Sequence, residues 1–226
     1  MIITPSSHNS HFLYSNTTPV TSGDEAISVI LALEAEMRQL GGCVGLSAPQ
    51  IGISRSVSII RHKNVSINLI NPEFISGELP FIYKDEGCMS LPNRRFNIPR
   101  FGMCRIKNNI LWPLNSDSVD VLENPNRLPL DRTNPPKGLG LSQVESVYVY
   151  ENDEETHGGI ICIAVQHEID HLLGKTLDKN PESVEQMSIA VDAKWKVGRN
   201  DPCPCGKIGL DGRPVKFKKC CLSKMT

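Results

Sequence analysis

The segment Gln166-His167-Glu168-Ile169-Asp170-His171 contains the pattern H-E-x-x-H, and it decides how the rest of the chain is interpreted. Four residues advance an α-helix by about 400°, so the two histidines project from one face, one turn apart, and can share a metal ion. Glu168 can reach a water on that metal as general base and then protonate the leaving group. Apolar flanks indicate a buried helix over 160–173, where three ionisable groups need a compensating partner. The segment therefore predicts a helix that carries a metal site.

A catalytic metal site needs a third protein ligand and an open fourth position. Leucine stands at position 177, where the metzincin pattern would place a third histidine. Glu182 and Glu185, on a helix expected over 181–197, could complete a thermolysin-like set, although no motif surrounds them. Cys88 is a better candidate, because a thiolate beside a glycine can approach a metal closely. Free cysteine is also common in protein cores, so the residues alone leave the role of Cys88 open.

Two further segments accompany the helix pattern: Gly45-Leu46-Ser47-Ala48-Pro49-Gln50 and Glu86-Gly87-Cys88-Met89-Ser90. Together with Gln166–His171 they resemble the three motifs of the peptide deformylase family, G-x-G-L-A-A-x-Q, E-G-C-L-S and Q-H-E-x-D-H, in the same order. Cys43 stands at the first glycine of the first motif, and Met89 at the leucine of the second. Three ordered motifs are far more specific than one. The resemblance spans about residues 22–178 and implies an α+β fold in which short antiparallel strands pack around a central H-E-x-x-H helix.

The resemblance implies a ligand set and a reaction. Cys88, His167 and His171 would bind one divalent metal, which is Fe²⁺ in most family members, with Zn²⁺, Ni²⁺ or Co²⁺ tolerated. A Cys-His-His set is equally suited to zinc, so the sequence does not choose the metal. Glu168 would accept the proton of the attacking water and deliver it to the departing amine. The substrates would be N-formylmethionyl nascent peptides, from which the enzyme would remove the formyl group.

The resemblance also implies roles around the metal. The Gln50 side-chain amide and the Met89 backbone N–H would donate hydrogen bonds to the developing oxyanion. Arg100 would pair with Asp170 and orient the helix. An apolar slot on the ligand face of the helix would suit a methionine side chain, although helical spacing makes Ile160 equally typical of a core residue. The residues expected to line this slot are Val44, Gly45, Ile160, Ile163 and Ala164.

The C-terminal segment over 198–226 predicts a second metal site. Its thiols form two close pairs, and four thiolates suit tetrahedral Zn²⁺ in a segment too small to fold without a metal. The pairs resemble the SEC-C motif, which implies docking on ribosomal RNA or a ribosome-associated partner. From residue 194 onward the formal charge is +7, against −8 for the rest, which agrees with an anionic partner, while a disordered basic tail is the alternative. The expected zinc ligands are Cys203, Cys205, Cys220 and Cys221.

Composition predicts the remaining organisation. With 226 residues, 39% hydrophobic and 22% charged, the chain fits one domain with a small appendage. No secretory signal or membrane-length apolar run is readable, so eight cysteines favour metal or catalytic use in a cytoplasmic protein. We expect a catalytic domain over 1–197, with an extended or loosely held start over 1–20 and a surface insertion over 107–142. A helix is expected between Ser22 and Gly41, and strands over 56–60, 65–70, 78–83 and 144–150.

Two other classes of function fit parts of the sequence. An H-E-x-x-H endopeptidase would use a histidine or glutamate as third ligand, so activity would survive the loss of Cys88. An inactive deformylase-like adaptor would bind a partner through the C-terminal segment, and it would have no need of a general base at Glu168. Because every residue that the hydrolytic chemistry requires is present, we favour the enzyme.

Overall fold

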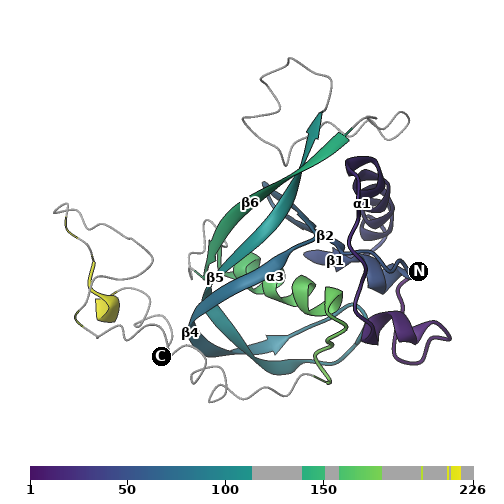
Figure 1. Ribbon diagram of the computed structural model, residues 1–226. Coiled ribbons are helices and arrows are strands. Elements are labelled where there is room, and N and C mark those ends of the chain that lie inside the picture. The colour runs from purple at the N-terminus through teal and green to yellow at the C-terminus, as the bar shows by residue number, and fades with distance from the viewer. Residues whose placement is uncertain (114–138, 151–157, 180–199, 201–212, 214, 220–226) are drawn as a thin grey trace.

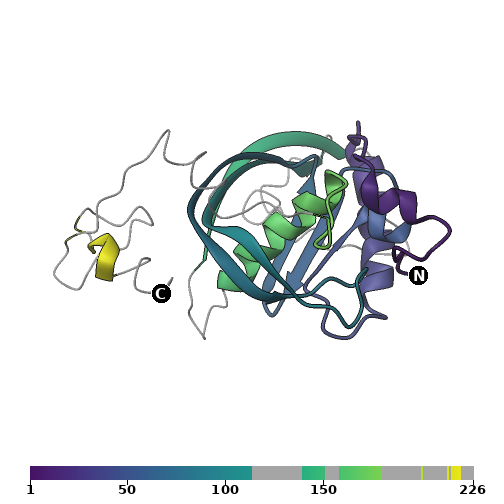
Figure 2. The ribbon, with the colours of Figure 1, turned by 90° about the horizontal axis from the view of Figure 1, so that it is seen from below.

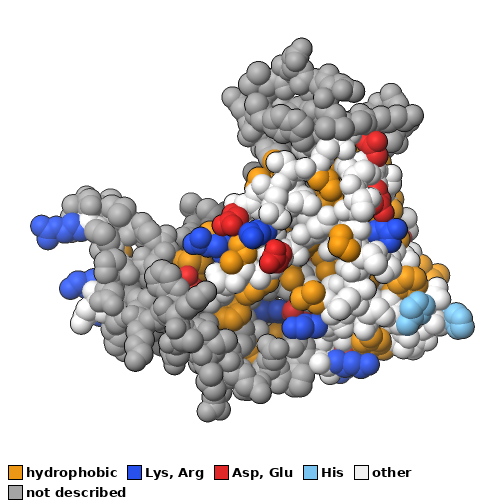
Figure 3. All heavy atoms as spheres, viewed as in Figure 1, with side chains coloured by type: hydrophobic (Ala, Val, Ile, Leu, Met, Phe, Trp, Pro, Cys, Tyr) orange, Lys and Arg blue, Asp and Glu red, His pale blue; other side chains and the backbone are white. Residues whose placement is uncertain are grey.

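A computed structural model describes residues 1–113, 139–150, 158–179, 200, 213 and 215–219 (Figure 1). The helix expected over 181–197 and the four cysteines of the expected zinc module lie outside these residues. None of the described helices has the length and apolar character needed to cross a membrane. Apolar and charged side chains intermingle on the described surface of the face shown in Figure 3.

Two antiparallel sheets of three strands each form the framework. The first sheet contains, in order, β1 (Gly45–Ser47), β2 (Val57–His62) and β3 (Val65–Ile70). The second contains, in order, β4 (Glu73–Glu86), β5 (Phe96–Pro113) and β6 (Leu139–Val149). β4 and β5 are long, not short as expected, and two register shifts in their pairing provide bends. The second sheet therefore curves around a helix instead of lying flat (Figure 2).

Two α-helices are positioned by these sheets, α1 (Gly23–Met37) and α3 (Gly158–Leu172). α1 begins where the sequence predicts, because the Ser22 hydroxyl accepts a hydrogen bond from the Glu25 N–H at 3.1 Å. α3 contacts strands of both sheets, so it lies at the centre of the fold. Within the part of the chain that the structure describes, three short 3₁₀ segments complete the elements: η1 (Ser10–Tyr14), η2 (Ala48–Ile51) and η3 (Phe217–Lys219).

The first hydrophobic core lies between α1 and the first sheet. Ile30 and Leu33 are fully buried there, and Leu111 and Leu139 reach the same core from β5 and β6. The contact is close, since a Cβ on Gly23 would lie 2.4 Å from the Leu139 carbonyl oxygen. Gly23, at the start of α1, thus lets the first residue of β6 pack closely against the helix.

The expectation of a surface insertion over 107–142 is wrong at both ends. Residues 107–113 and 139–142 belong to β5 and β6, which pair from Met103 opposite Val149 to Pro113 opposite Leu139. The strands continue because their apolar residues have a core to enter beside α1. Only residues 114–138 remain for an insertion, and they lie outside the described residues.

The expectation of a loosely held start over 1–20 is also wrong. Leu13 in η1 is fully buried, and Ile3 and Val20 are buried as well. The Thr17 N–H and hydroxyl both donate to the Leu172 carbonyl at the end of α3, at 3.0 and 2.9 Å. Scattered apolar residues in a polar segment have no periodicity, yet Ile3, Leu13 and Val20 each have a buried place in the fold.

Candidate metal centre

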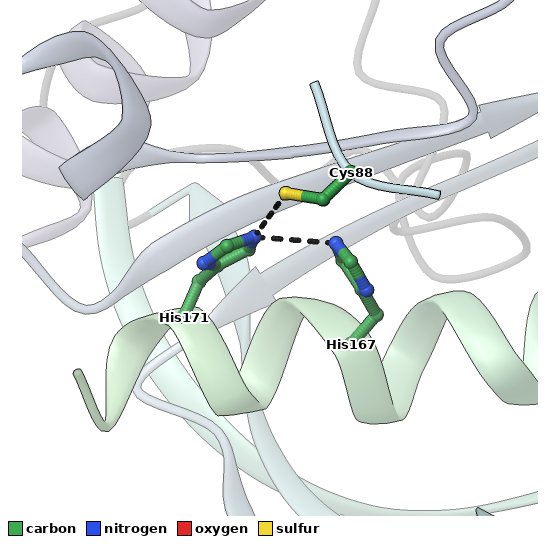
Figure 4. A group of neighbouring side chains, drawn as sticks. All are labelled: Cys88, His167 and His171. Atoms are coloured by element: carbon green, nitrogen blue, oxygen red, sulfur yellow. Dashed lines mark hydrogen bonds between the residues drawn. The ribbon is translucent and has the colours of Figure 1, made fainter. Parts of the chain in front are cut away.

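Cys88, His167 and His171 converge on one point between α3 and the loop that follows β4 (Figure 4). Their three ligand atoms all lie within 4.8 Å of one another. Nε2 of His171 is 3.2 Å from both the Cys88 Sγ and Nε2 of His167. The sequence placed the histidines together through their i, i+4 spacing, and the fold brings in the thiol from a segment that is remote along the chain.

A buried chain of ionic hydrogen bonds holds His167. Its Nδ1 is 2.7 Å from Glu86 Oε1, so an N–H at that position donates to the carboxylate and leaves Nε2 to face the site. The Arg100 guanidinium donates to Glu86 at 2.9 and 2.5 Å and to Asp170 at 2.6 Å. The expected pair of Arg100 and Asp170 is confirmed, and Glu86 links it to a metal-site histidine.

The end of β4 places Glu86 and Cys88. A register shift between Tyr83 and Glu86 interrupts the pairing with β5, and Asp85 adopts a positive φ of 58° there. Such a bulge re-aims the side chains that follow it, and Glu86 is indeed buried, at 4% exposure, although its two predecessors are exposed. Gly87 then lets Arg95 lie over the backbone, since a Cβ at that glycine would be 1.8 Å from Nη1 of Arg95.

Charge at the centre shifts three pKa values. Burial raises the pKa of the Cys88 thiol, but His171 and His167 beside it lower that pKa to about 5. Burial also raises the pKa of Glu86, and the hydrogen bonds from Arg100 and His167 lower it to about 2. Burial lowers the pKa of His167, whereas its contacts with Cys88 and Glu86 raise it well above the usual value. The centre thus combines a thiolate and a carboxylate with an imidazole that retains a proton, and metal ions commonly displace such protons on binding.

Glu168 lies beside the three ligands, packed against β1. A Cβ on Gly45 would be 2.3 Å from Glu168 Oε1, so the carboxylate occupies the space that any larger residue would fill. Its Oε2 is buried and has no hydrogen-bond partner among the described residues, and burial raises the pKa of this carboxyl group. An unpartnered buried carboxylate oxygen next to three metal-type ligands is suited to holding the proton of a reacting water.

Gln50 faces the same centre from η2. The N–H and hydroxyl of Ser47 both donate to its Oε1 at 3.0 Å, which fixes the orientation of the amide. Its Nε2 then donates toward Cys88 Sγ at 3.6 Å and Ser90 Oγ at 3.2 Å. The side chain is 1% exposed. The amide N–H groups therefore point into the site, where the sequence expected an oxyanion donor.

A pocket of about 590 Å³ opens beside these groups. It is lined by the five residues expected at the methionine slot, Val44, Gly45, Ile160, Ile163 and Ala164, and by the catalytic candidates Gln50, Met89 and Glu168. Cys43 also lines it, and the Cys43 thiol donates to the Gly45 carbonyl at 3.0 Å. Burial raises the pKa of this thiol to about 12, so Cys43 remains protonated, as expected of a packing residue and not of a ligand.

The donor set fits a divalent metal. One thiolate and two imidazole nitrogens are the ligand types that zinc and the later first-row transition metals prefer. Two imidazole nitrogens that face one another at 3.2 Å with a thiolate alongside need a cation or a proton between them. Glu182 and Glu185, the alternative third ligands, lie outside the described residues.

The sequence predicted no role for two residues of the site, Glu86 and Ser47, although both stand within the motif segments 86–90 and 45–50. The sequence does signal Glu86, as an acidic residue two positions before a candidate ligand, but its partners Arg100 and His167 are distant along the chain. Ser47 carries a signal too, since serine three residues before glutamine is a capping box, here at the start of η2.

Comparison with known proteins gives the chain its relatives. A family model described as polypeptide deformylase matches residues 3–109. A peptide deformylase of Acidobacterium capsulatum is 37% identical over 87 residues, which are 36% of this chain and 51% of that protein, so the match spans about half of the relative's length. Peptide deformylase 1 of Burkholderia multivorans is 26% identical over 186 residues, 80% of this chain and 82% of that protein.

A solved structure agrees on the fold. The class I type b peptide deformylase of Acinetobacter baumannii with bound Met-Ala-Ser has a TM-score of 0.54 and 22% identity, and the match covers 80% of this chain and 96% of that one. At this identity the likeness shows the deformylase fold, with mixed helix and antiparallel strands. The family model and the curated relatives thus make this chain similar to peptide deformylases, and the solved structure shares its fold.

Proposed function

We propose that this protein is a metal-dependent hydrolase that removes the N-terminal formyl group from formylmethionine of newly made polypeptides. The observation that carries the proposal is the convergence of Cys88, His167 and His171 within 4.8 Å, beside the buried carboxylate of Glu168. The relatives named peptide deformylase support the same reaction.

In this proposal Cys88, His167 and His171 hold a divalent cation. Bound there, the metal supplies Lewis-acid activation of water and of the formyl carbonyl. Glu168 accepts a proton from the attacking water and returns it to the amine nitrogen as the formyl C–N bond breaks. One water is consumed, and formate and a free N-terminus are released. The raised pKa of the buried Glu168 carboxyl favours a group that can both accept and return a proton.

The developing oxyanion is stabilised by two donors in this proposal. Ser47 holds the Gln50 amide, so its N–H groups are already oriented. They need little reorientation when negative charge develops on the substrate oxygen. The Met89 backbone N–H is the second donor, which explains why a side chain other than leucine is acceptable there. Donors of this kind have been worth about 3–4 kcal/mol in other enzymes.

The apolar wall of the pocket would select methionine. Val44, Ile163 and Ala164 line it next to Glu168, and an unbranched thioether fits an irregular apolar slot. The related Acinetobacter baumannii enzyme has been solved with bound Met-Ala-Ser, a peptide that begins with methionine.

The metal and the C-terminal segment complete the proposal. We assign Fe²⁺ to the catalytic site by resemblance, and Zn²⁺ to Cys203, Cys205, Cys220 and Cys221 in a module over 198–226. The basic charge of that segment would direct the enzyme to the ribosome. If deletion of residues 198–226 leaves co-sedimentation with ribosomes unchanged, the ribosome contact is wrong.

Hydrolysis of formyl-Met-Ala-Ser under anaerobic conditions with Fe²⁺ tests the activity. We expect turnover by the native protein, loss of at least about a hundredfold in Glu168→Ala, and no change in Glu73→Ala, which removes an exposed carboxylate at the start of β4. Absence of turnover in the metal-loaded native protein would favour an inactive adaptor. Cleavage of a peptide bond of the substrate in place of its formamide, retained in Cys88→Ala, would instead favour an endopeptidase with a different third ligand.

A further inference from the structure

Two cysteines that the proposed mechanism does not use face each other between β5 and α3. Sγ of Cys104 and Sγ of Cys162 are 3.9 Å apart, and the side chains are 1% and 0% exposed. The two residues are 58 positions apart in the sequence, so their approach is a feature of the tertiary fold. Both are free thiols.

The pair belongs to a series of contacts that tie α3 to β5. Gln166, one turn after Cys162, donates to the Phe101 carbonyl at 2.9 Å and accepts from the Phe101 N–H at 2.8 Å. Asp170, another turn on, pairs with Arg100 at 2.6 Å. The three contacts therefore lie on one face of the helix, at positions 162, 166 and 170. The first contact is a thiol pair, and it is the only one of the three that could become covalent.

The two sulfur atoms are in contact but are not at bonding distance. An S–S bond measures about 2.05 Å, so the sulfur atoms must approach each other by about 2 Å. At present Cys162 Sγ lies 3.5 Å from the Tyr148 carbonyl, 3.6 Å from the Phe101 carbonyl and 3.6 Å from Gln166 Nε2. Bond formation would therefore take this sulfur away from the groups that now hold it.

We propose that Cys104 and Cys162 form a site of reversible disulfide formation that controls the position of α3 and lowers the activity of the enzyme when closed. The oxidant is a small two-electron acceptor such as a hydroperoxide or an azo compound. Two S–H bonds break and one S–S bond forms, while two electrons and two protons pass to the oxidant. A hydroperoxide is reduced to an alcohol and water, and the azo bond of diamide is reduced to a hydrazine. Because both thiols are buried, the reaction requires local opening and is slow.

The expected effect on activity follows from the metal-site residues that α3 carries. His167 and His171 lie on α3, while Cys88 belongs to the loop after β4. A closed disulfide draws α3 toward β5 and releases Cys162 from Gln166, so the two halves of the ligand set change their separation. Misplacements of about 1 Å in catalytic groups have cost a hundredfold in rate. We expect kcat/KM to fall at least about tenfold on closure.

Peptide mapping of the metal-loaded full chain after treatment with diamide tests the site itself. We expect a linked peptide that contains Cys104 and Cys162, two mass units lighter than the reduced pair, which disappears after treatment with a phosphine reductant. If both thiols can still be alkylated after a treatment that fully oxidises the urea-unfolded chain, the proposal is overturned. A linkage of either thiol to Cys43 or Cys88 in its place overturns it as well.

Activity of the same samples tests whether the disulfide regulates the enzyme. Oxidised native protein should lose activity and regain it on reduction, whereas Cys104→Ala and Cys162→Ala, compared each with its own untreated sample, should lose none. Two separate variants guard against a folding defect in one of them, and Cys43→Ala serves as a matched thiol control that still responds. An equal loss of activity in the two alanine variants overturns the proposed regulation. A mapped linkage without loss of activity overturns it as well. This second experiment rests on the proposed function, while the mapping does not, so the two failures can be told apart.

Discussion

The two α-helices of the described residues, α1 and α3, have the same length, 15 residues, but they are packed by opposite means. α1 buries only apolar residues and a glycine, and its core partners in the first sheet are apolar as well. α3 also has apolar neighbours, yet it buries Gln166, Glu168 and His171 at 5%, 2% and 1% exposure. A buried apolar side chain stabilises the fold without a specific partner, whereas a buried polar group is costly unless each hydrogen bond is satisfied. The α1 side therefore supplies stability, and the α3 side uses part of it to hold a reactive geometry.

The largest effect is expected where a buried charge loses its partner. Arg100→Met would leave Glu86 buried, and Asp170 partly buried, without their shared cation, and breaking a buried pair typically costs about 3–5 kcal/mol. Activity and metal retention should fall together, because Glu86 also holds His167. Urea unfolding, metal content and kcat/KM measure the three effects.

A matched arginine on the same strand provides the control. Arg105 is exposed, so Arg105→Met should change the free energy of unfolding by about 0.5 kcal/mol or less. If Arg100→Met proves as mild as Arg105→Met, the buried network is not what positions the metal-site helix.

On the α1 side the expected cost falls on stability alone. Leu33→Ala removes a fully buried side chain from the apolar core and should destabilise the protein by about 3 kcal/mol. Because no polar group loses a partner and the site is built on α3, kcat/KM measured well below the unfolding temperature should stay at the native value. A loss of activity as large as that of Arg100→Met would show that the two sides are not separable.

Two glycines sharpen the contrast, since each is in close contact with a different neighbour. A Cβ at Gly45 would collide with the Glu168 carboxylate, whereas a Cβ at Gly23 would collide with the Leu139 backbone. Gly45→Ala should lower kcat/KM by about a hundredfold, which is the scale of a misplaced catalytic group. Gly23→Ala should lower the melting temperature and leave kcat/KM unchanged. Steady-state kinetics and thermal unfolding of both variants measure the difference, and a reversed pattern would contradict it.

The same contrast explains which elements could be predicted from the sequence. α1 was predicted from the Ser22 cap and the apolar period, and β3 was predicted over its full length, because in both the pattern reports a face that packs on apolar neighbours. β5 was not predicted. It carries Arg100 and Asn108, both buried, and Asn108 is satisfied by the Ile70 N–H and the Asn68 carbonyl of β3. Partners so distant along the chain leave no local signal.

The candidate site divides in a similar way. Helical spacing placed His167 and His171 on one face, with Glu168 beside the first of them, which elementary geometry suffices to predict. Cys88 and Gln50 could be assigned only through resemblance to a family, because a lone thiol and a lone amide are ambiguous. Neither helical spacing nor the family resemblance predicts the role of Glu86, because that role depends on a bulge that turns the end of β4 inward.

The smallest expected effect is a pH dependence that belongs to the polar side alone. The pKa of Glu86 is lowered to about 2 in the folded protein, against an ordinary value of 4.5, so its contribution to stability is present above pH 4.5 and is lost as the pH falls toward 2. Between pH 6 and pH 3 this amounts to about 2 kcal/mol. Urea unfolding of the metal-free protein at the two pH values should show this loss in the native chain and in Leu33→Ala, and a smaller loss in Glu86→Gln. If Glu86→Gln keeps the full acid sensitivity, the stabilising carboxylate lies elsewhere, and the buried link from Arg100 to His167 is not the electrostatic element inferred from its geometry.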